Sequence, residues 1–158
     1  MGFFITFEGP DGSGKSTQIK RLYEHLQTLG YDAYLTREPG GTAISEEIRG
    51  LLHDLSHREM APRAEILLYS AARAQLVKQV IRPHLAAGGI VLCDRYYDST
   101  LAYQGYGHGL DLDTLRRITE FATEGLRPDL TLLLDLDAAA GLARRQTGGG
   151  GGNRLDGH

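Results

Sequence analysis

The nine residues GPDGSGKST, at positions 9–17, decide the fold of this chain. They match the spacing G-x-x-x-x-G-K-[ST] at Gly9, Gly14, Lys15 and Ser16. Binding a phosphate chain requires many backbone N–H donors aimed at one point, and glycine supplies bare backbone that can adopt the necessary turn. We therefore expect a nucleoside triphosphate here, with Lys15 on the β- and γ-phosphates and the Ser16 hydroxyl on Mg²⁺. The residues of this predicted nucleotide site are Gly9, Pro10, Asp11, Gly12, Ser13, Gly14, Lys15, Ser16 and Thr17.

The segments on either side of this phosphate loop support the prediction. Residues 3–7, FFITF, form an apolar run that favours a β-strand. Apolar residues then follow the loop at helical spacing, at Ile19, Leu22, Leu26 and Leu29. A helix at this position adds unpaired N–H groups and the positive end of its dipole to the anion site. The alternative is a glycine-rich turn that only joins a strand to a helix.

Length and composition set the broad class of protein. The chain has 158 residues, enough for one domain over residues 1–158. The net charge of −3 gives no basic field for nucleic acid. No apolar run reaches the roughly 18 residues of a membrane span, and a strand at the N-terminus leaves no signal peptide. The single cysteine, Cys93, fits a reducing compartment, so we expect a cytoplasmic protein without a membrane partner.

Strands are expected to alternate with helices along the rest of the chain. The predicted strands are residues 31–36, 90–93 and 130–136, the last two as continuous apolar runs covered on both faces. The predicted helices are one capped by Thr42 or Ser45, one over residues 63–87 with Pro83 in its last turns, one over 99–104 ended by the glycines at 105, 107 and 109, one from Asp111 or Asp113 to 124, and one over 138–145. Residues 53–60 are expected to form a loop. This alternation predicts an α/β fold with a parallel sheet that binds ligands outside the carboxyl ends of its strands.

Charged residues at the predicted strand ends are candidates for phosphoryl transfer, which depends on positioning and positive charge. Arg37, Arg73 and Arg95 have the planar fork suited to phosphate, although any one of them alone could be a solvated surface charge. Asp94, directly after an apolar strand, is a candidate ligand of Mg²⁺ or a turn residue. Asp11 is unexpected inside a phosphate loop, because a carboxylate repels phosphate unless it binds a cation or a hydroxyl.

Two further groups of residues complete the candidates. Tyr69, Tyr96, Tyr97 and Tyr103 are able to stack on a base, or else to pack as ordinary half-buried residues. A run of five glycines over residues 148–152 is flexible by composition and is flanked by Arg144, Arg145 and Arg154. We expect residues of about 144–158 to form a mobile lid that closes on the triphosphate.

Together these stretches resemble the thymidylate kinases, which are P-loop nucleoside monophosphate kinases. The resemblance covers almost the whole chain: FEGPDGSGKST at 7–17, TREPGGT at 36–42, LLYSAARAQ at 67–75, DRYYDSTLAYQG at 94–105 and RPDLTLLLD at 127–135. It implies a three-layer P-loop NTPase fold, a homodimer, and transfer of the γ-phosphoryl group of ATP to dTMP, giving dTDP for dTTP biosynthesis with Mg²⁺ as cofactor.

The resemblance also implies individual roles. Asp11 would face the sugar 3′-hydroxyl and the substrate phosphate, and Arg37 and Arg95 would bind the monophosphate. Tyr69 would stack on thymine, and Arg73 would contact the base or the phosphate. The remaining residues of the nucleoside pocket would be Thr100, Tyr103 and Gln104, with Tyr103 crowding the 2′ position. The catalytic group would be Lys15, Asp94, Arg95 and Arg154.

The chain departs from the family pattern in two places. Gly12 stands where some members carry a loop arginine, and in members with a small residue there the lid provides the positive charge. This places weight on Arg144, Arg145 and above all Arg154. The family also continues beyond residue 158, so we expect a fragment or a truncated relative with an unpaired sheet edge and an uncovered apolar face.

Two other functions fit the same residues. A deoxynucleoside kinase would use Glu38 as the base on a 5′-hydroxyl, although the arginines suited to an acceptor phosphate favour dTMP. The second alternative is a truncated domain that binds nucleotide without turnover.

Overall fold

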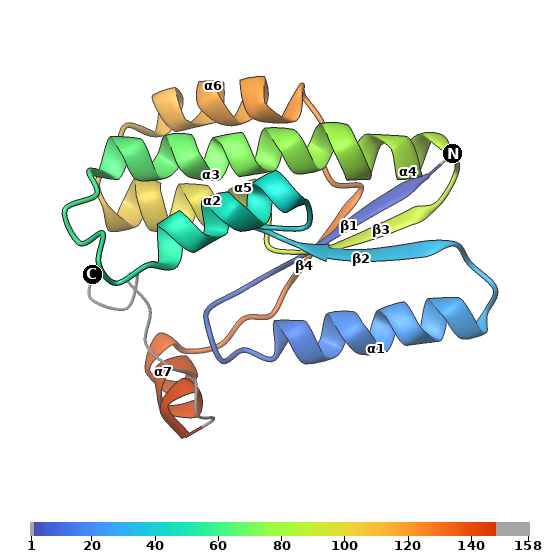
Figure 1. Cartoon of the computed structure of the whole chain (residues 1–158). Helices are drawn as coiled ribbons and strands as arrows, with labels where there is room; N and C mark the ends of the chain where they lie inside the picture. The colour runs from blue at the N-terminus through green and yellow to red at the C-terminus, as the bar shows by residue number, and fades with distance from the viewer. Residues whose placement is uncertain (1, 148–158) are drawn as a thin grey trace.

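The computed structural model describes residues 2–147, apart from the side chains of residues 138, 142 and 145–147. Four strands, β1 (Phe3–Glu8), β2 (Ala33–Arg37), β3 (Ile90–Asp94) and β4 (Leu130–Leu133), form a sheet in the order β2-β3-β1-β4. Every pair is parallel, as the sequence predicts (Figure 1). All the carboxyl ends therefore lie at one edge, where ligands bind in such sheets.

Helices cover both faces of this sheet (Figure 1). One face carries α1 (Lys15–Thr28), and the other carries α3 (Pro62–Leu76) with α2 (Ala43–His53) and α6 (Leu112–Thr123) packed against it. The remaining helices are the π-helix η1 (Val77–Ile81), α4 (Arg82–Ala86), α5 (Tyr97–Thr100), the π-helix η2 (Leu101–Gly107) and α7 (Ala138–Thr147). None of the helices described is both long and apolar enough to cross a membrane.

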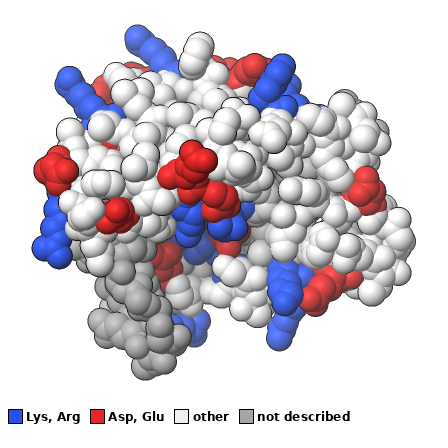
Figure 2. All heavy atoms as spheres, in the orientation of Figure 1, with Lys and Arg blue, Asp and Glu red and all other residues white. Residues whose placement is uncertain are grey.

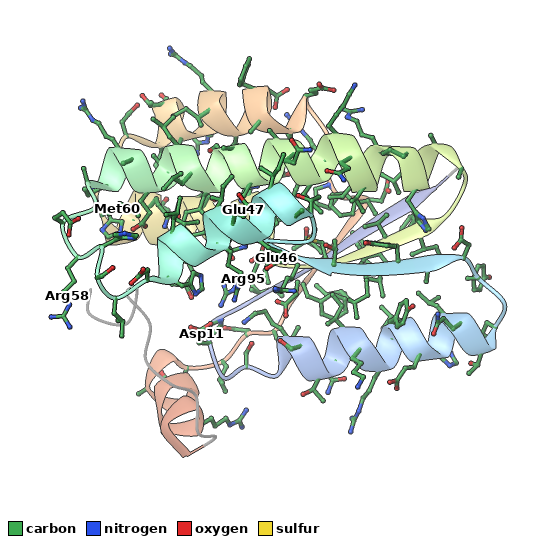
Figure 3. The ribbon with its side chains drawn as sticks, in the orientation of Figure 1. Asp11, Glu46, Glu47, Arg58, Met60 and Arg95 are labelled. Carbon is green, nitrogen blue, oxygen red and sulfur yellow. The ribbon has the colours of Figure 1, made fainter. Side chains whose placement is uncertain are left out.

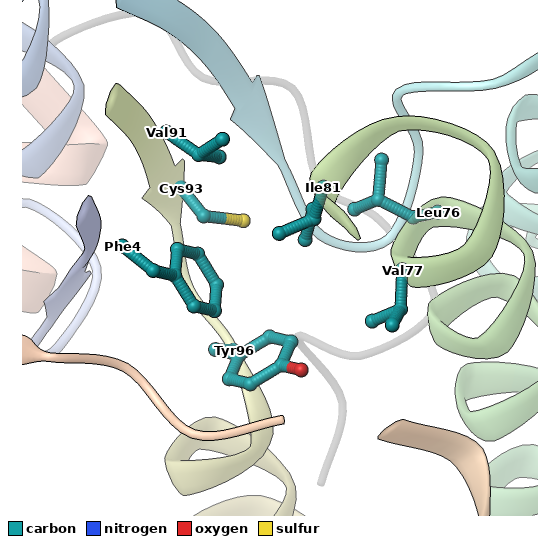
Figure 4. Packing of buried hydrophobic residues seen from close by; sticks show 7 residues of the cluster. All are labelled: Phe4, Leu76, Val77, Ile81, Val91, Cys93 and Tyr96. Atoms are coloured by element: carbon teal, nitrogen blue, oxygen red, sulfur yellow. The ribbon is translucent and has the colours of Figure 1, made fainter. Parts of the chain in front are cut away.

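The core is divided between the two faces of the sheet. Between the sheet and α3–η1, a buried cluster is formed by Phe4, Leu76, Val77, Ile81, Val91, Cys93 and Tyr96 (Figure 4). Between the sheet and α1, a second cluster contains Ile5, Phe7, Ile19 and Leu92. Alternate residues of β1 and β3 enter opposite clusters because successive side chains of a strand point to opposite faces. The predicted three-layer arrangement is confirmed.

Helix ends follow the predicted chemistry. The Thr42 hydroxyl accepts a hydrogen bond from the Ser45 backbone N–H at 3.1 Å, and an Asp111 carboxylate oxygen accepts one from Thr114 at 2.8 Å. Each therefore satisfies an otherwise unpaired donor of its helix. The structure thus selects Thr42 over Ser45 and Asp111 over Asp113 as N-caps.

The predicted helix over residues 63–87 is present as a continuous helical run through α3, η1 and α4. Its middle turn is a π-helix, which the apolar periodicity does not reveal. The run passes Pro83, which stands in the first turn of α4 and thus at a position where helices tolerate proline.

The prediction that glycines end the short helix after residue 99 is wrong at Gly105. The helical run starts at Tyr97 and continues through η2 to Gly107. A Cβ at Gly105 would lie 2.6 Å from the Leu112 side chain and 3.2 Å from that of Leu115. Gly105 therefore permits close packing of η2 on α6 rather than ending the helix.

The prediction for the last strand also needs correction. β4 ends at Leu133 instead of residue 136, and it is not covered on both faces. Leu130 and Leu133 are exposed, because β4 lies at the edge of the described sheet. A groove of about 460 Å³ runs beside it, lined by Phe7, Gln18, Leu22 and residues 131–134. Within the described residues, this edge of the sheet therefore presents apolar side chains to solvent.

Candidate nucleotide and phosphate site

The phosphate loop joins β1 to α1 at the carboxyl edge of the sheet. Gly9, Gly12 and Gly14 have positive φ angles of 139°, 78° and 93°, which the loop requires and which side chains disfavour. A Cβ at Gly9 would also lie 2.5 Å from the Leu134 carbonyl oxygen. No side chain caps the first turn of α1, and that turn has no acidic residue. Its N–H groups and dipole therefore remain directed at the loop, as an anion site needs.

Lys15 lies across this loop. Its Nζ donates to the carbonyl oxygens of Gly9 and Pro10, both at 2.8 Å, and its side chain is buried. Burial, followed by the nearby Arg95 charge, lowers the pKa of Lys15 below its ordinary value. An ammonium group with only carbonyl partners is well placed to bind a phosphate oxygen, which is a stronger acceptor.

Ser16 and Asp94 meet between the loop and the end of β3. The Ser16 hydroxyl donates to Asp94 Oδ2 at 2.7 Å, although the two residues are 78 positions apart. Among the described residues, no group of three or more His, Cys, Asp or Glu side chains could hold a metal. One hydroxyl and one carboxylate nevertheless fit Mg²⁺, which often combines few protein ligands with phosphate oxygens and water. These two residues would hold the ion, which would supply positive charge beside the phosphates.

Arg95 is held by several contacts at the end of β3. Its φ of 70° is in the left-handed region, and its backbone N–H donates to Phe7. Its guanidinium forms an ion pair with Asp11, donates to the Ser99 hydroxyl at 3.0 Å, and lies 5.3 Å from the centre of the Tyr103 ring. Asp11 and Arg95 lie together between the loop and α2 (Figure 3). The unexpected carboxylate in the loop thus has a cationic partner.

Glu8, at the end of β1, binds the segment that follows Arg95. One carboxylate oxygen accepts from the Tyr96 backbone N–H and the other from the Ser99 hydroxyl, both at 2.7 Å. Burial raises the pKa of Glu8 despite these hydrogen bonds. Glu8 was not among the candidates from sequence, because its partners come from another strand end.

Arg73 is buried and forms an ion pair with Glu38. Its Nε and Nη2 each lie 2.7 Å from Glu38 Oε2, and Nη2 also donates to the Thr100 hydroxyl at 3.0 Å. Burial would lower the pKa of Arg73, but the Glu38 carboxylate raises it overall, so the guanidinium stays charged. Arg73 Nη1 and Glu38 Oε1 are both buried with no hydrogen-bond partner. Buried polar atoms are rarely left unpaired, so this pair is suited to a polar ligand.

Arg37 is held by a different acid. Its Nη2 donates to both oxygens of Glu46, at 3.0 and 2.9 Å, and the pair is about half exposed. Arg49, which sequence reasoning missed, donates to the Pro39 carbonyl at 3.0 Å. Burial, together with the nearby Arg37 charge, lowers its pKa. Arg49 is thus a further cation close to Arg37. Its helical spacing from Ser45 and Leu52 on α2 was the available signal in the sequence.

The structure places the predicted site residues as two groups that meet at the loop. Lys15, Ser16 and Asp94 form one, and Arg95, Asp11 and Tyr103 form the other. Lys and Arg side chains are recessed at the centre of this face, beneath acidic side chains (Figure 2). Tyr69 is half-buried on α3, and Gln104 is buried on η2.

The predicted lid arginines are only partly placed. Arg144 is exposed on α7, the side chain of Arg145 is outside the described part of the structure, and Arg154 lies outside it altogether. α7 itself contacts the loop. A Cβ at Gly12 would collide with the Gly141 carbonyl oxygen, and a Cβ at Gly141 would lie 2.5 Å from that of Asp11.

A glycine-rich loop of this geometry, between the first strand of a parallel sheet and the helix after it, defines the class of P-loop NTPase folds. The neighbouring cations and the Ser16–Asp94 contact place the chain among the members that handle phosphate chains at this edge.

Comparison with known proteins gives the family. The thymidylate kinase family model matches residues 7–153, and the chain belongs to that family. It is 63% identical over 149 residues to a thymidylate kinase of Roseiflexus sp. (strain RS-1), and 60% identical over 146 residues to one of Herpetosiphon aurantiacus. These alignments cover 94% and 92% of the chain, and the chain spans 66% and 62% of the two relatives' lengths. A crystal structure of thymidylate kinase from Ehrlichia chaffeensis matches with a TM-score of 0.81 and 39% identity, covering 93% of this chain and 83% of that one.

Proposed function

We propose that this chain carries an ATP-dependent dTMP kinase activity, which transfers the γ-phosphoryl group of ATP to a 5′-phosphate oxygen of dTMP and yields ADP and dTDP. The observation that carries the proposal is the contact of Arg95 with Asp11 of the phosphate loop. It places a cation suited to an acceptor phosphate directly beside the loop suited to the donor. Family membership supplies the nucleoside.

The chain's own residues would act mainly by position and charge, which is how such reactions are catalysed. Lys15 and the first turn of α1 would bind the donor phosphates. Ser16 and Asp94 would hold Mg²⁺. Arg95, with Arg37, would hold the acceptor phosphate in line, and each arginine already lies in a fixed hydrogen-bonded geometry.

The nucleoside would lie against α3 and α5–η2. Tyr69 would stack on the base, and Arg73, Thr100 and Gln104 would provide its polar contacts. Tyr103 would crowd the 2′ position of the sugar, since its ring lies beside the Arg95 guanidinium. The unpaired Nη1 of Arg73 supports a ligand at this wall.

A coupled assay of ADP formation tests the proposal directly. With ATP and Mg²⁺, the chain should phosphorylate dTMP far faster than thymidine, and EDTA should stop the reaction. Transfer to thymidine but not to dTMP would reverse the assignment of the acceptor.

The two alternatives predict different results in the same experiment. A deoxynucleoside kinase would need Glu38 as a base, but Glu38 Oε2 is already bound by Arg73, and the family comparisons do not favour this reading. A binding domain without turnover would bind ATP in calorimetry yet release no ADP at any enzyme concentration.

We also propose that residues 1–158 act as one kinase domain with a lid at about residues 144–158, in the cytoplasm and as a homodimer. Large apolar side chains on α3 and α6 support an interface, since Phe121 is 88% exposed and Leu67 57%. A groove of about 410 Å³ between these helices is lined by Ala74, Val77 and Phe121, among others. Light scattering should give twice the chain mass, and Phe121→Glu should shift it toward the monomer. A parent that scatters as a monomer at high concentration would contradict the dimer.

A further inference from the structure

Glu65 is a buried carboxylate that the proposed mechanism does not use. It lies in the first turn of α3, and its side chain is 1% exposed. Its Oε1 accepts a hydrogen bond from Gln104 Nε2 at 2.8 Å and lies 3.3 Å from His108 Nε2. Burying a carboxylate costs free energy unless hydrogen bonds or ion pairs stabilise it, and these two contacts provide that stabilisation. A buried acid with such partners is a candidate for a specific role.

The contacts place Glu65 at the wall assigned to the base. Glu65, Tyr69 and Arg73 follow one another at intervals of four residues, so they share a face of α3. Arg73 reaches Thr100 and Glu65 reaches Gln104, which gives two polar links between α3 and the α5–η2 segment. Tyr69 stands between these links along α3. Gln104 therefore borders the same part of the wall as the ring proposed to stack on the base.

The chemistry of the pair fixes the direction of the Gln104 amide. An ionised carboxylate only accepts hydrogen bonds, whereas an amide has a donor NH₂ and an acceptor oxygen. The NH₂ group must therefore face Glu65, and the amide oxygen must face away from it. Among the described residues, this is the one hydrogen bond of the Gln104 side chain, so its oxygen is available to a ligand.

We propose that Glu65 is a positioning residue that sets selectivity for thymine over cytosine, an inference that rests on the proposed dTMP kinase activity. With its amide held in this direction, Gln104 presents an acceptor to the base. Thymine and uracil carry a donor N–H at N3, whereas cytosine carries an acceptor there. Two facing acceptors leave a buried polar group unpaired, which is how a hydrogen-bonding site rejects a close analogue.

His108 supports the same arrangement. Its Nε2 lies 3.3 Å from the oxygen that Gln104 uses, so a protonated imidazole forms an ion pair with the carboxylate. His108 stands directly after η2, and its backbone N–H donates to the Tyr103 carbonyl. Glu65 at the start of α3 thus contacts both Gln104 within η2 and His108 directly after it.

The test compares kcat/KM for three acceptors, dTMP, dUMP and dCMP, in the parent and in Glu65→Gln. The substituted amide has nearly the same shape but can donate or accept, so Gln104 is free to turn over. The dTMP-to-dCMP ratio should fall by roughly tenfold or more, the effect of one net hydrogen bond. The dTMP-to-dUMP ratio should stay unchanged, because those bases differ in a methyl group and share the N3 donor.

Matched variants separate positioning from a structural role. Glu24→Gln makes the same chemical change in an exposed pair on α1 and should leave both ratios unaltered. Glu65→Asp keeps an acceptor-only group and should retain more of the dTMP preference than Glu65→Gln. Should Glu65→Gln fail to fold, Gln104→Met removes the amide instead and should lower the dTMP-to-dCMP ratio in the same way.

The outcomes also distinguish this inference from the proposed function. A parent that does not phosphorylate dTMP contradicts the function itself. If the parent phosphorylates dTMP but Glu65→Gln keeps the parent's dTMP-to-dCMP ratio of kcat/KM, the role of Glu65 is overturned. This holds even if the variant loses activity equally on all three acceptors. Calorimetric binding of dTMP and dCMP in the absence of ATP provides the same comparison without turnover.

Discussion

Lys15 is the residue proposed to bind the donor phosphates. Lys15→Ala should lower kcat by roughly 10² to 10³, the usual effect of removing one group that stabilises developing charge. The fold should persist, because the lost contacts are to two loop carbonyls. Steady-state kinetics and a thermal melt would measure the two effects. Lys20→Ala, in an exposed ion pair on the same helix, is the control. Near-normal activity of Lys15→Ala would show that the loop has only a structural role.

Glu8 makes a prediction about pH. Its folded-state pKa is raised above 4.5 by burial, so the folded protein binds this proton more tightly than the unfolded chain does. The contribution of Glu8 to stability is therefore fully present below about pH 4.5 and is lost as the pH rises through the folded-state pKa. Glu8→Gln removes that dependence and can still accept the Tyr96 hydrogen bond.

The measurement for Glu8 is the melting temperature against pH. The variant should gain stability relative to the parent as the pH rises from about 4.5. Parallel curves for the two proteins would show that the carboxylate stays charged throughout. Glu24→Gln, on the exposed side of α1, provides the comparison for a glutamate that is not buried.

Individual site residues could be predicted where the signal is local. The phosphate loop, Asp94 and Arg95 follow from motifs and strand ends, and the structure brings them together. Glu8, Arg49 and Glu65 could not be predicted in this way. Their roles come from partners between 10 and 91 positions away, and no spacing within one element encodes such contacts.

At the scale of elements, the packing of η2 on α6 gives a stability prediction. Gly105→Ala should lower the free energy of unfolding by about 1 to 3 kcal/mol, a typical cost of overpacking, because the new methyl group meets Leu112 and the buried Leu115. Urea denaturation would measure it.

Gly107 provides a matched control in the same π-helix. A Cβ there would meet nothing closer than 3.7 Å, so Gly107→Ala has the same gain in helix propensity without the contact. Equal stability of the two variants would show that the Leu112 side chain simply moves aside.

The elements themselves follow from sequence better than their ends do. Apolar runs and caps located each helix and strand of residues 2–147, since both signals depend on neighbouring residues. The two π-helices did not appear in the periodicity, and β4 was extended too far. Leu134 and Leu136 continue the apolar pattern of β4, but strand pairing with β1 ends at Leu133, and only the partner strand sets that limit.

At the scale of the whole molecule, the layered architecture was predictable because alternating strands and helices permit few arrangements. In the proposed reaction, positive charge at the transferred phosphate has to come from outside the loop, since Gly12 leaves the loop without an arginine. We predict that one of Arg144, Arg145 and Arg154 supplies it, with Arg154 as first choice. Its alanine variant should lower kcat by roughly 10³ or more while changing the KM for ATP much less.

Single alanine variants at the three positions, assayed at saturating ATP and dTMP, decide this prediction. Arg116→Ala, in an exposed pair on α6, is the matched control for loss of one surface arginine. If all three variants keep a kcat within a few-fold of the parent, the lid arginines do not supply this charge. Arg37 or Arg95 would then be the source.

The close approach of Gly12 to Gly141 has a consequence for how such proteins diverge. Because the two backbones touch, neither position accepts a side chain while the other partner stays in place. A single substitution of Gly12 by arginine is therefore not compatible with α7 in its present position. A side chain at residue 12 therefore requires α7 to lie elsewhere, so we expect substitutions at residues 12 and 141 to depend on each other.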